Sequence, residues 1–215
     1  MEREESVKHV VDRSGWPSGP WDNEEDYYQW YYRGHPCLIV RSHLGNLCGY
    51  AGVYPGHPAY QKHYDDVNVN VHGGLTYSNF CHEPICHVAR EGEPVAYWLG
   101  FDCGHFGDLA PGMVAFHEKY LTDGGKGFFG DDVYRDVLYV ATEVEDLVDQ
   151  LVGLTPDKVT DTSDERAKRH YCFNRMSQDR KAGVVSDWDP KRYEIYEQEY
   201  EMLRVKQLEA PKETA

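Results

Sequence analysis

The pattern of apolar and polar positions predicts β-strands in the first half of the chain. Residues 67–71 alternate strictly between valine and asparagine, as expected for a strand with one buried face. The apolar runs 37–40 and 47–53 are separated by a Gly-Asn pair, and this arrangement predicts a β-hairpin. Residues 95–101 predict another strand, and we expect the aromatic segment 21–32 to pack across the domain as a strand or an ordered flap.

Helical periodicity replaces this pattern in the second half. Apolar residues recur every three or four positions over residues 133–151, which predicts an amphipathic helix of about five turns. Gly153 and Pro156 are expected to end this helix, and residues 157–169 are polar enough to form a linker. A last amphipathic helix is predicted for residues 191–209, where it either packs back on the domain or mediates self-association into a homo-oligomer.

Strands followed by helices favour an α+β fold. We expect a mostly antiparallel sheet with one long helix packed on it, plus a C-terminal helical extension. The predicted organisation is an N-terminal segment, an α+β core domain that carries the functional site, and a linker with the C-terminal helix: residues 1–19, 20–155 and 156–215.

Composition narrows the classes of partner. The 215 residues include 22 basic and 37 acidic side chains, for a formal net charge of −15. This balance disfavours binding to a long nucleic acid, which depends on clustered Lys and Arg. No stretch approaches the roughly 20 apolar residues of a membrane span, and residues 1–13 lack the apolar run of a signal peptide. We therefore expect a cytoplasmic protein without a membrane partner, and its six cysteines to be reduced thiols.

Residues that carry chemistry gather in the middle of the chain. Seven of the eleven histidines fall within residues 57–117, so a site is sought there first. One predicted strand ends at His72, directly before Gly73 and Gly74, and another ends at Asp102 before a glycine-containing turn. Histidine and carboxylate groups held at rigid strand ends, beside glycines that allow close approach, are suited to proton transfer, metal binding or polar ligand recognition.

A divalent metal ion is one candidate cofactor. Asp102, His105 and Asp108 follow at intervals of three, so their side chains can converge in a turn as a mixed nitrogen and oxygen ligand set. Standard zinc patterns are absent, because there is no His-Glu-x-x-His and no pair of cysteines two residues apart. Residues 81–87 permit either a small structural metal site or, more simply, a surface loop with one buried cysteine.

A metal-free mechanism is an open alternative. His72 would act as a general base oriented by Asp66 or Asp102, and the N–H groups of Gly73 and Gly74 would stabilise an oxyanion. Cys103 is disfavoured as a nucleophile because a carboxylate precedes it. The candidate catalytic residues are therefore His72, Asp66, Asp102 and His105. The residues expected to contact the ligand are His57, His63, Tyr64, Gly73, Gly74, Thr76 and Trp98.

Three motifs also carry a resemblance. The order of Gly-Asn-Leu-Cys-Gly-Tyr at 45–50, His-Gly-Gly-Leu-Thr at 72–76 and Gly-Phe-Asp-Cys-Gly-His-Phe-Gly-Asp at 100–108 resembles a family of uncharacterised proteins from bacteria and bacteriophages. The resemblance covers about residues 20 to 152. It implies a domain boundary and a source, with the host cytoplasm as the location for a phage protein, and it implies no activity.

Two function classes remain open. Histidines beside carboxylates suit a metal or a proton relay better than a bare phosphate, which prefers Arg or Lys. The glycine-rich run 124–127 lacks the spacing of a phosphate-binding loop and is interpreted as a turn. We therefore favour a small hydrolase-like enzyme, with or without a divalent metal, acting on a polar small molecule such as a nucleotide derivative. The alternative is a non-catalytic phage protein that sequesters a host nucleotide signal as an anti-defence measure.

Overall fold

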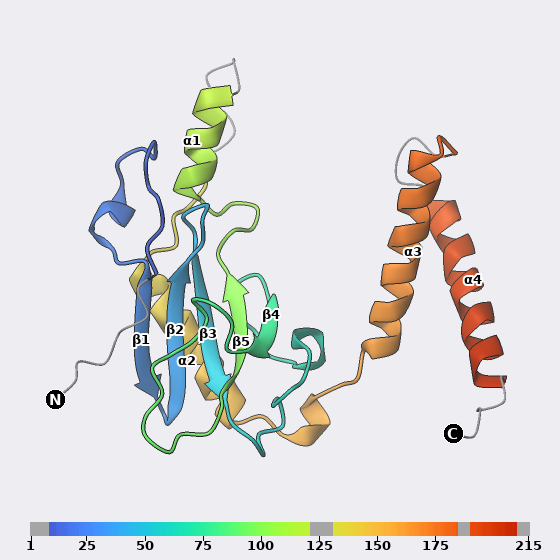
Figure 1. Cartoon of the computed structure of the whole chain (residues 1–215), viewed down its shortest axis with the longest axis horizontal. Helices are drawn as coiled ribbons and strands as arrows, with labels where there is room; N and C mark the ends of the chain where they lie inside the picture. The colour runs from blue at the N-terminus through green and yellow to red at the C-terminus, as the bar shows by residue number, and fades with distance from the viewer. Residues whose placement is uncertain (1–8, 121–130, 185–189, 210–215) are drawn as a thin grey trace. The chain divides into compact units, whose positions relative to one another are not determined.

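The computed structural model describes residues 9–120, 131–184 and 190–209 (Figure 1). The chain divides into two compact units, Met1–Thr160 and Asp161–Ala215. The first unit contains a five-stranded antiparallel sheet with a long helix against it, and the second contains two helices. These elements confirm the predicted α+β class with a C-terminal helical extension. The glycine-rich run 124–127 lies outside the described residues.

The sheet has the strand order β1-β2-β3-β5-β4, with every neighbouring pair antiparallel. The predicted hairpin is confirmed, because β2 and β3 pair with Cys37 opposite Ala51. The predicted strand at 95–101 is also present, two residues later than its pattern indicated. The strands span Tyr27–Tyr32 (β1), His35–Arg41 (β2), Leu47–Val53 (β3), Tyr77–Phe80 (β4) and Tyr97–Asp102 (β5).

Helix α2, Val137–Val152, covers one face of the sheet and lies behind it in Figure 1. Its buried stripe packs on the side chains that β2, β3 and β5 direct to that face, and these residues form the main core. The predicted helix is therefore confirmed, although it begins four residues later than its pattern suggested. Val133 is instead held by backbone hydrogen bonds to Gly107 and Leu109, and Asp136 caps the helix by accepting from the Tyr139 amide.

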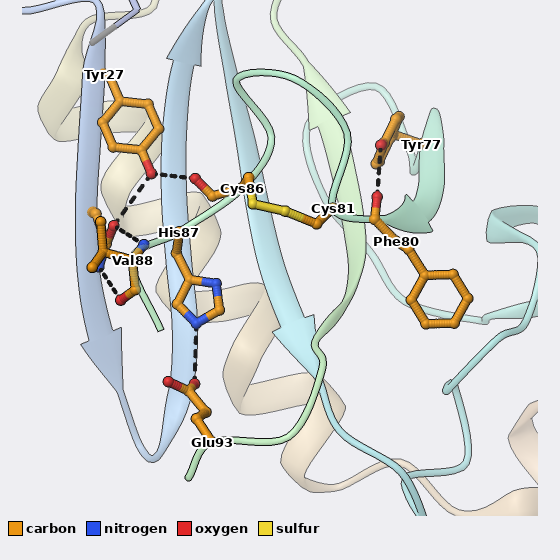
Figure 2. Close-up of a disulfide and its surroundings, with 9 residues drawn as sticks. Tyr27, Tyr77, Phe80, Cys81, Cys86, His87, Val88 and Glu93 are labelled. Atoms are coloured by element: carbon orange, nitrogen blue, oxygen red, sulfur yellow. Dashed lines mark hydrogen bonds and ion pairs between the residues drawn. A yellow bond between two sulfur atoms is a disulfide. The ribbon is translucent and has the colours of Figure 1, made fainter. Parts of the chain in front are cut away.

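The opposite face of the sheet is covered by residues 81–96, which cross in front of the strands (Figure 1). This segment is tied to β1 by side-chain hydrogen bonds, among them Tyr27 Oη to the Cys86 carbonyl at 2.6 Å (Figure 2). Trp98 is fully buried beneath it. Because both faces are covered, β2 and β3 are buried along almost their whole length.

Two of the six cysteines form a disulfide, which corrects the prediction that all are reduced thiols. Cys81 and Cys86 are bonded, with their Cα atoms 4.7 Å apart (Figure 2). The intervening residues form a tight turn in which His82 and Ile85 exchange backbone hydrogen bonds. The turn brings the two cysteines within the range that a disulfide requires, and spacing alone did not reveal this local geometry.

The strand predicted at residues 67–71 is wrong as an element, although its burial pattern is right. Val67 and Val71 are buried in the main core, but only Val67 makes a β-bridge, to Val159. The segment runs along α2. Gln150 of that helix bonds the backbone N–H and C=O of Asn70, so a helix side chain takes the place of a neighbouring strand.

The second unit is a pair of helices, α3 (Ser163–Lys181) and α4 (Pro190–Glu209). Helix α4 was predicted, but α3 was not, and residues 163–169 of the proposed linker belong to it. The small core between the two helices consists of Cys172, Met176 and Tyr196. Ion pairs between the helices add to this contact, including Arg204–Asp164 at 2.8 Å. An apolar stripe that short leaves little helical signal in the sequence.

The remaining helical elements are short. They are α1 (Pro111–Tyr120) and the 3-10 turns η1 (Pro20–Asn23), η2 (Tyr64–Asp66) and η3 (Pro156–Lys158). Among the residues that the structure describes, no helix is both long and apolar enough to cross a membrane.

Candidate functional site

Three predicted site residues meet where β5 ends and α2 begins. His72, His105 and Asp108 each offer a donor atom, and these atoms lie within 4.8 Å of one another. We call these three residues the His-His-Asp cluster. It is the single group of this kind found within residues 9–120, 131–184 and 190–209. Its composition differs from the predicted metal ligands, because His72 joins His105 and Asp108 while Asp102 lies to one side.

Asp108 is the centre of the cluster. Its Oδ2 atom lies 2.7 Å from His72 Nε2 and 3.7 Å from His105 Nδ1, and it accepts from the His105 amide at 3.1 Å. The other oxygen, Oδ1, accepts from Arg135 Nε at 2.9 Å. Burial by itself would raise the pKa of Asp108, but these hydrogen bonds together hold the pKa below its ordinary value. The carboxylate is therefore an anion able to bind a cation.

His72 is held from both sides. Its Nδ1 atom is hydrogen-bonded to Tyr139 Oη at 2.9 Å, and its backbone N–H donates to Glu143 at 2.9 Å. The carboxylate that the structure places on its other ring nitrogen belongs to Asp108, whereas the sequence suggested Asp66 or Asp102. With both ring nitrogens engaged, His72 has no free position from which to act as a general base in this arrangement.

His105 is the least satisfied member of the cluster. Its Nδ1 atom is buried and has no hydrogen-bond partner. Carboxylate oxygens of Asp108 and Asp102 lie 3.7 and 3.9 Å from that atom, beyond hydrogen-bonding distance. The ring rests on Gly73, which has a φ of +65°, and a Cβ atom there would lie 2.1 Å from Cε1 of His105. Gly73 is thus required so that the imidazole can occupy this place.

Asp102 borders the cluster. It accepts hydrogen bonds from Thr76 Oγ1 and from the Gly104 amide, both at 3.0 Å, and its side chain is about a third exposed. The predicted site residue Thr76 is therefore close to the cluster and orients this carboxylate. Gly74 does not act as predicted, because its N–H already donates to the Val71 carbonyl at 3.0 Å. It is not free to stabilise an oxyanion.

Five predicted residues lie elsewhere. His57 bonds the carbonyl of Leu151, in the last turn of α2, about 18 Å along that helix from Tyr139 at 1.5 Å per residue. His63 caps η2, where its ring packs on Tyr64 with the centroids 4.1 Å apart.

Tyr64 in turn is tied to the edge strand β4 by a hydrogen bond from its amide to Ser78. Trp98 is directed to the opposite face of the sheet from α2, since side chains alternate along β5. Asp66 is buried in η2, and its carbonyl accepts from the Thr160 amide.

Three residues in α2 or just before it were not assigned by sequence reasoning. Arg135, which precedes the N-cap Asp136, holds Asp108, and Tyr139 and Glu143 of the helix hold His72. Tyr139 and Glu143 are four residues apart and lie on one helical face, and this spacing is the signal that could have found those two. A buried network fixes the segment, because the fully buried Arg41 bonds Tyr134 Oη at 2.7 Å and Glu24 at 2.7 Å.

A pocket of about 260 Å³ opens beside the cluster, with His105 and Asp108 in its wall. Cys103 lies next to the site but is fully buried, and burial, followed by the charge of Asp108, raises the pKa of its thiol. It remains an uncharged core residue.

Comparison with protein-family models, with curated proteins and with solved structures finds no match to this chain.

Proposed function

We propose that the chain is a hydrolase-like enzyme that uses a divalent metal ion, held by the His-His-Asp cluster, to act on a polar small molecule. The observation that carries the proposal is the buried Nδ1 atom of His105, which has no hydrogen-bond partner and lies among two other donor atoms. Leaving a buried polar atom unpaired costs free energy, and a cation between the three donors would remove that cost.

The donor set fits a zinc-type ion. Two imidazoles and one carboxylate are the protein ligands of many catalytic zinc sites, in which a further position stays open. Ligand atoms about 2.1 Å from a tetrahedral ion are about 3.4 Å from one another. The distance from His105 Nδ1 to Asp108 Oδ2 is 3.7 Å, close to this value, and the 2.7 Å hydrogen bond from His72 would lengthen as an ion entered.

The surrounding residues match the usual support of such a site. Metal-bound histidines commonly hydrogen-bond a second group through the other ring nitrogen, and bound carboxylates are themselves hydrogen-bonded. Tyr139 serves His72 in this way, and Arg135 serves Asp108. A bound ion supplies Lewis-acid polarisation of a substrate carbonyl and activation of water.

Asp102 is the proposed general base. It lies beside His105, is partly exposed, and is already oriented by Thr76. It would take a proton from water as the new carbon–oxygen bond forms, and would return the proton to the leaving group as the old bond breaks. The net change is addition of one water across the cleaved bond, so no oxidant or other co-reactant is needed.

A non-catalytic role is the alternative, and a different observation supports it. Both ring nitrogens of His72 are already hydrogen-bonded, an arrangement that holds a group in place rather than transferring its proton. A protein of this kind would retain a small ligand, such as a nucleotide signal, without turnover.

The test is a zinc titration followed by an ester hydrolysis assay with p-nitrophenyl acetate. We expect one zinc per chain, lost in His72→Ala and His105→Ala but kept in His57→Ala, the matched histidine at the far end of α2. Asp102→Asn should keep zinc and lose hydrolysis. Zinc binding without hydrolysis of any ester would favour the alternative, and unchanged binding in His105→Ala would refute the metal site.

The location and assembly of the chain remain predictions. We propose a cytoplasmic protein from a bacterium or bacteriophage, with self-association through the C-terminal helices. Size-exclusion chromatography with light scattering, on the full chain and on a variant ending at Thr160, tests the second point.

A further inference from the structure

The pocket beside the cluster has apolar residues in its lining. Leu44, Phe106 and Met113 line it together with His105 and Asp108. Small-molecule pockets typically combine an apolar lining with a few polar groups that fix orientation. A ligand seated here would place an apolar group against these three residues and a polar group at the cluster.

Phe106 is the most unusual of these residues, because its side chain is fully exposed to solvent. It lies in the turn between His105 and Asp108, so two members of the cluster flank it in sequence. Large aromatic side chains are usually buried, and one left bare at the edge of a pocket offers a flat surface on which a planar or aliphatic group can pack.

The charges around the pocket disfavour an anionic ligand. Asp132 joins Asp108 in its lining, and the described residues of the lining include no Lys or Arg. Arg135 is near but is bonded to Asp108 at 2.9 Å. A divalent ion (+2) and Arg135 (+1) would together balance the carboxylates of Asp102, Asp108 and Asp132 (−3). No net positive charge would remain for a phosphate dianion.

We infer that the site takes an uncharged or cationic molecule in which a carbonyl group is attached to a planar or aliphatic group, and that it discriminates against phosphate esters. This inference rests on the proposed function and names its substrate class. Of the parts of a nucleotide derivative, a base-like planar group fits this description, whereas the phosphate does not. The carbonyl faces the cluster, and the apolar group packs on Phe106.

Calorimetric titration of the zinc-loaded full chain tests the inference with three probes. Benzamide is uncharged and has a carbonyl and a ring, acetamide has the carbonyl alone, and phenyl phosphate has a ring and an anion. We expect benzamide to bind at least about tenfold more tightly than phenyl phosphate, a difference of about 1.4 kcal/mol. Phe106→Ala should weaken benzamide about tenfold and leave acetamide unchanged.

Two further variants complete the test, the first as a control and the second as a change of charge. Phe173→Ala removes an exposed ring from the second unit and should change nothing. Asp132→Asn removes one negative charge from the pocket and should narrow the difference in affinity between benzamide and phenyl phosphate. Because Phe106 is fully exposed, its replacement is not expected to disturb folding, which thermal melting of each variant checks.

The outcomes separate the two proposals. If zinc binds but phenyl phosphate binds as tightly as benzamide, the substrate class is wrong and the metal site stands. The same holds if Phe106→Ala weakens both amides equally or neither. If the chain binds no zinc, the proposed function fails and the inference fails with it.

Discussion

Gly73 offers a sharp test of the site, because its neighbour Gly74 is a matched control. Both have a positive φ, +65° and +87°, so an alanine at either position adopts a left-handed backbone conformation. That conformation costs an alanine about 1–2 kcal/mol. For a chain of this size the cost corresponds to a fall in melting temperature of about 2–4 °C per kcal/mol. On this count alone, Gly73→Ala and Gly74→Ala should be equally destabilised.

The two positions differ in what the new methyl group would meet. A Cβ at Gly74 has nothing within 4 Å, whereas a Cβ at Gly73 lies 2.1 Å from Cε1 and 2.4 Å from Nδ1 of His105. Carbon atoms in contact are about 3.5 Å apart, so the imidazole must retreat by about 1.4 Å. Metal–ligand distances tolerate only about 0.2 Å, and His105 would therefore cease to be a ligand.

We expect Gly73→Ala to lower zinc affinity by a factor on the order of 100, since perturbing the surroundings of a ligand alone costs 10–100-fold. Gly74→Ala should stay within about twofold of the native chain. Competition with a chromophoric chelator measures the affinities, and thermal melting measures the shared backbone cost. Equal zinc affinity in the two variants would show that His105 does not bind the ion where the structure places it.

Three more predictions concern charges and thiols. Arg135→Met should weaken zinc binding about 10–100-fold by releasing the carboxylate of the cluster, whereas Arg33→Met, which breaks an exposed ion pair at the far end of α2, should not. Burial raises the pKa of Glu93, but hydrogen bonds from two tyrosines, a backbone amide and a histidine outweigh this and lower the pKa to about 2. The ionised Glu93 therefore stabilises the fold above pH 4.5, and this stabilisation is lost as the pH falls toward 2. Urea unfolding of the native chain should show this loss, and Glu93→Gln should show a smaller loss, because Asp108 and Asp26, whose pKa values are also lowered, still contribute. Thiol titration of the unfolded chain should find four free thiols, and six after reduction of Cys81–Cys86; six before reduction would contradict the disulfide.

The sequence predicted those elements whose burial pattern follows from a single kind of neighbour. Helix α2 has one apolar stripe on one sheet, so its periodicity was visible. The strand predicted at residues 67–71 was wrong because the alternation of valine and asparagine indicates only that one side of the segment is buried. A helix can bury that side as well as a neighbouring strand can. Helix α3 was not predicted because it contributes mainly two buried residues, Cys172 and Met176, to a core, and two residues do not make a visible periodic pattern.

The candidate site was predicted in part for a related reason. His105 and Asp108 are close in sequence, and the turn between them makes their proximity a local property. The approach of His72 to Asp108 depends on how a segment 36 residues earlier in the chain runs along α2, which no local pattern specifies. Tyr139 of that helix and Arg135, just before its N-cap, complete the site, so they became recognisable only once the position of the helix was known.

Anomalous diffraction from crystals of the zinc-loaded chain, recorded on both sides of the zinc absorption edge, tests the central claim most directly. We predict one strong anomalous peak between His72, His105 and Asp108, at about 2.0–2.2 Å from one donor atom of each. A zinc peak elsewhere in the chain, with the His72–Asp108 hydrogen bond unchanged, would contradict the proposed metal site.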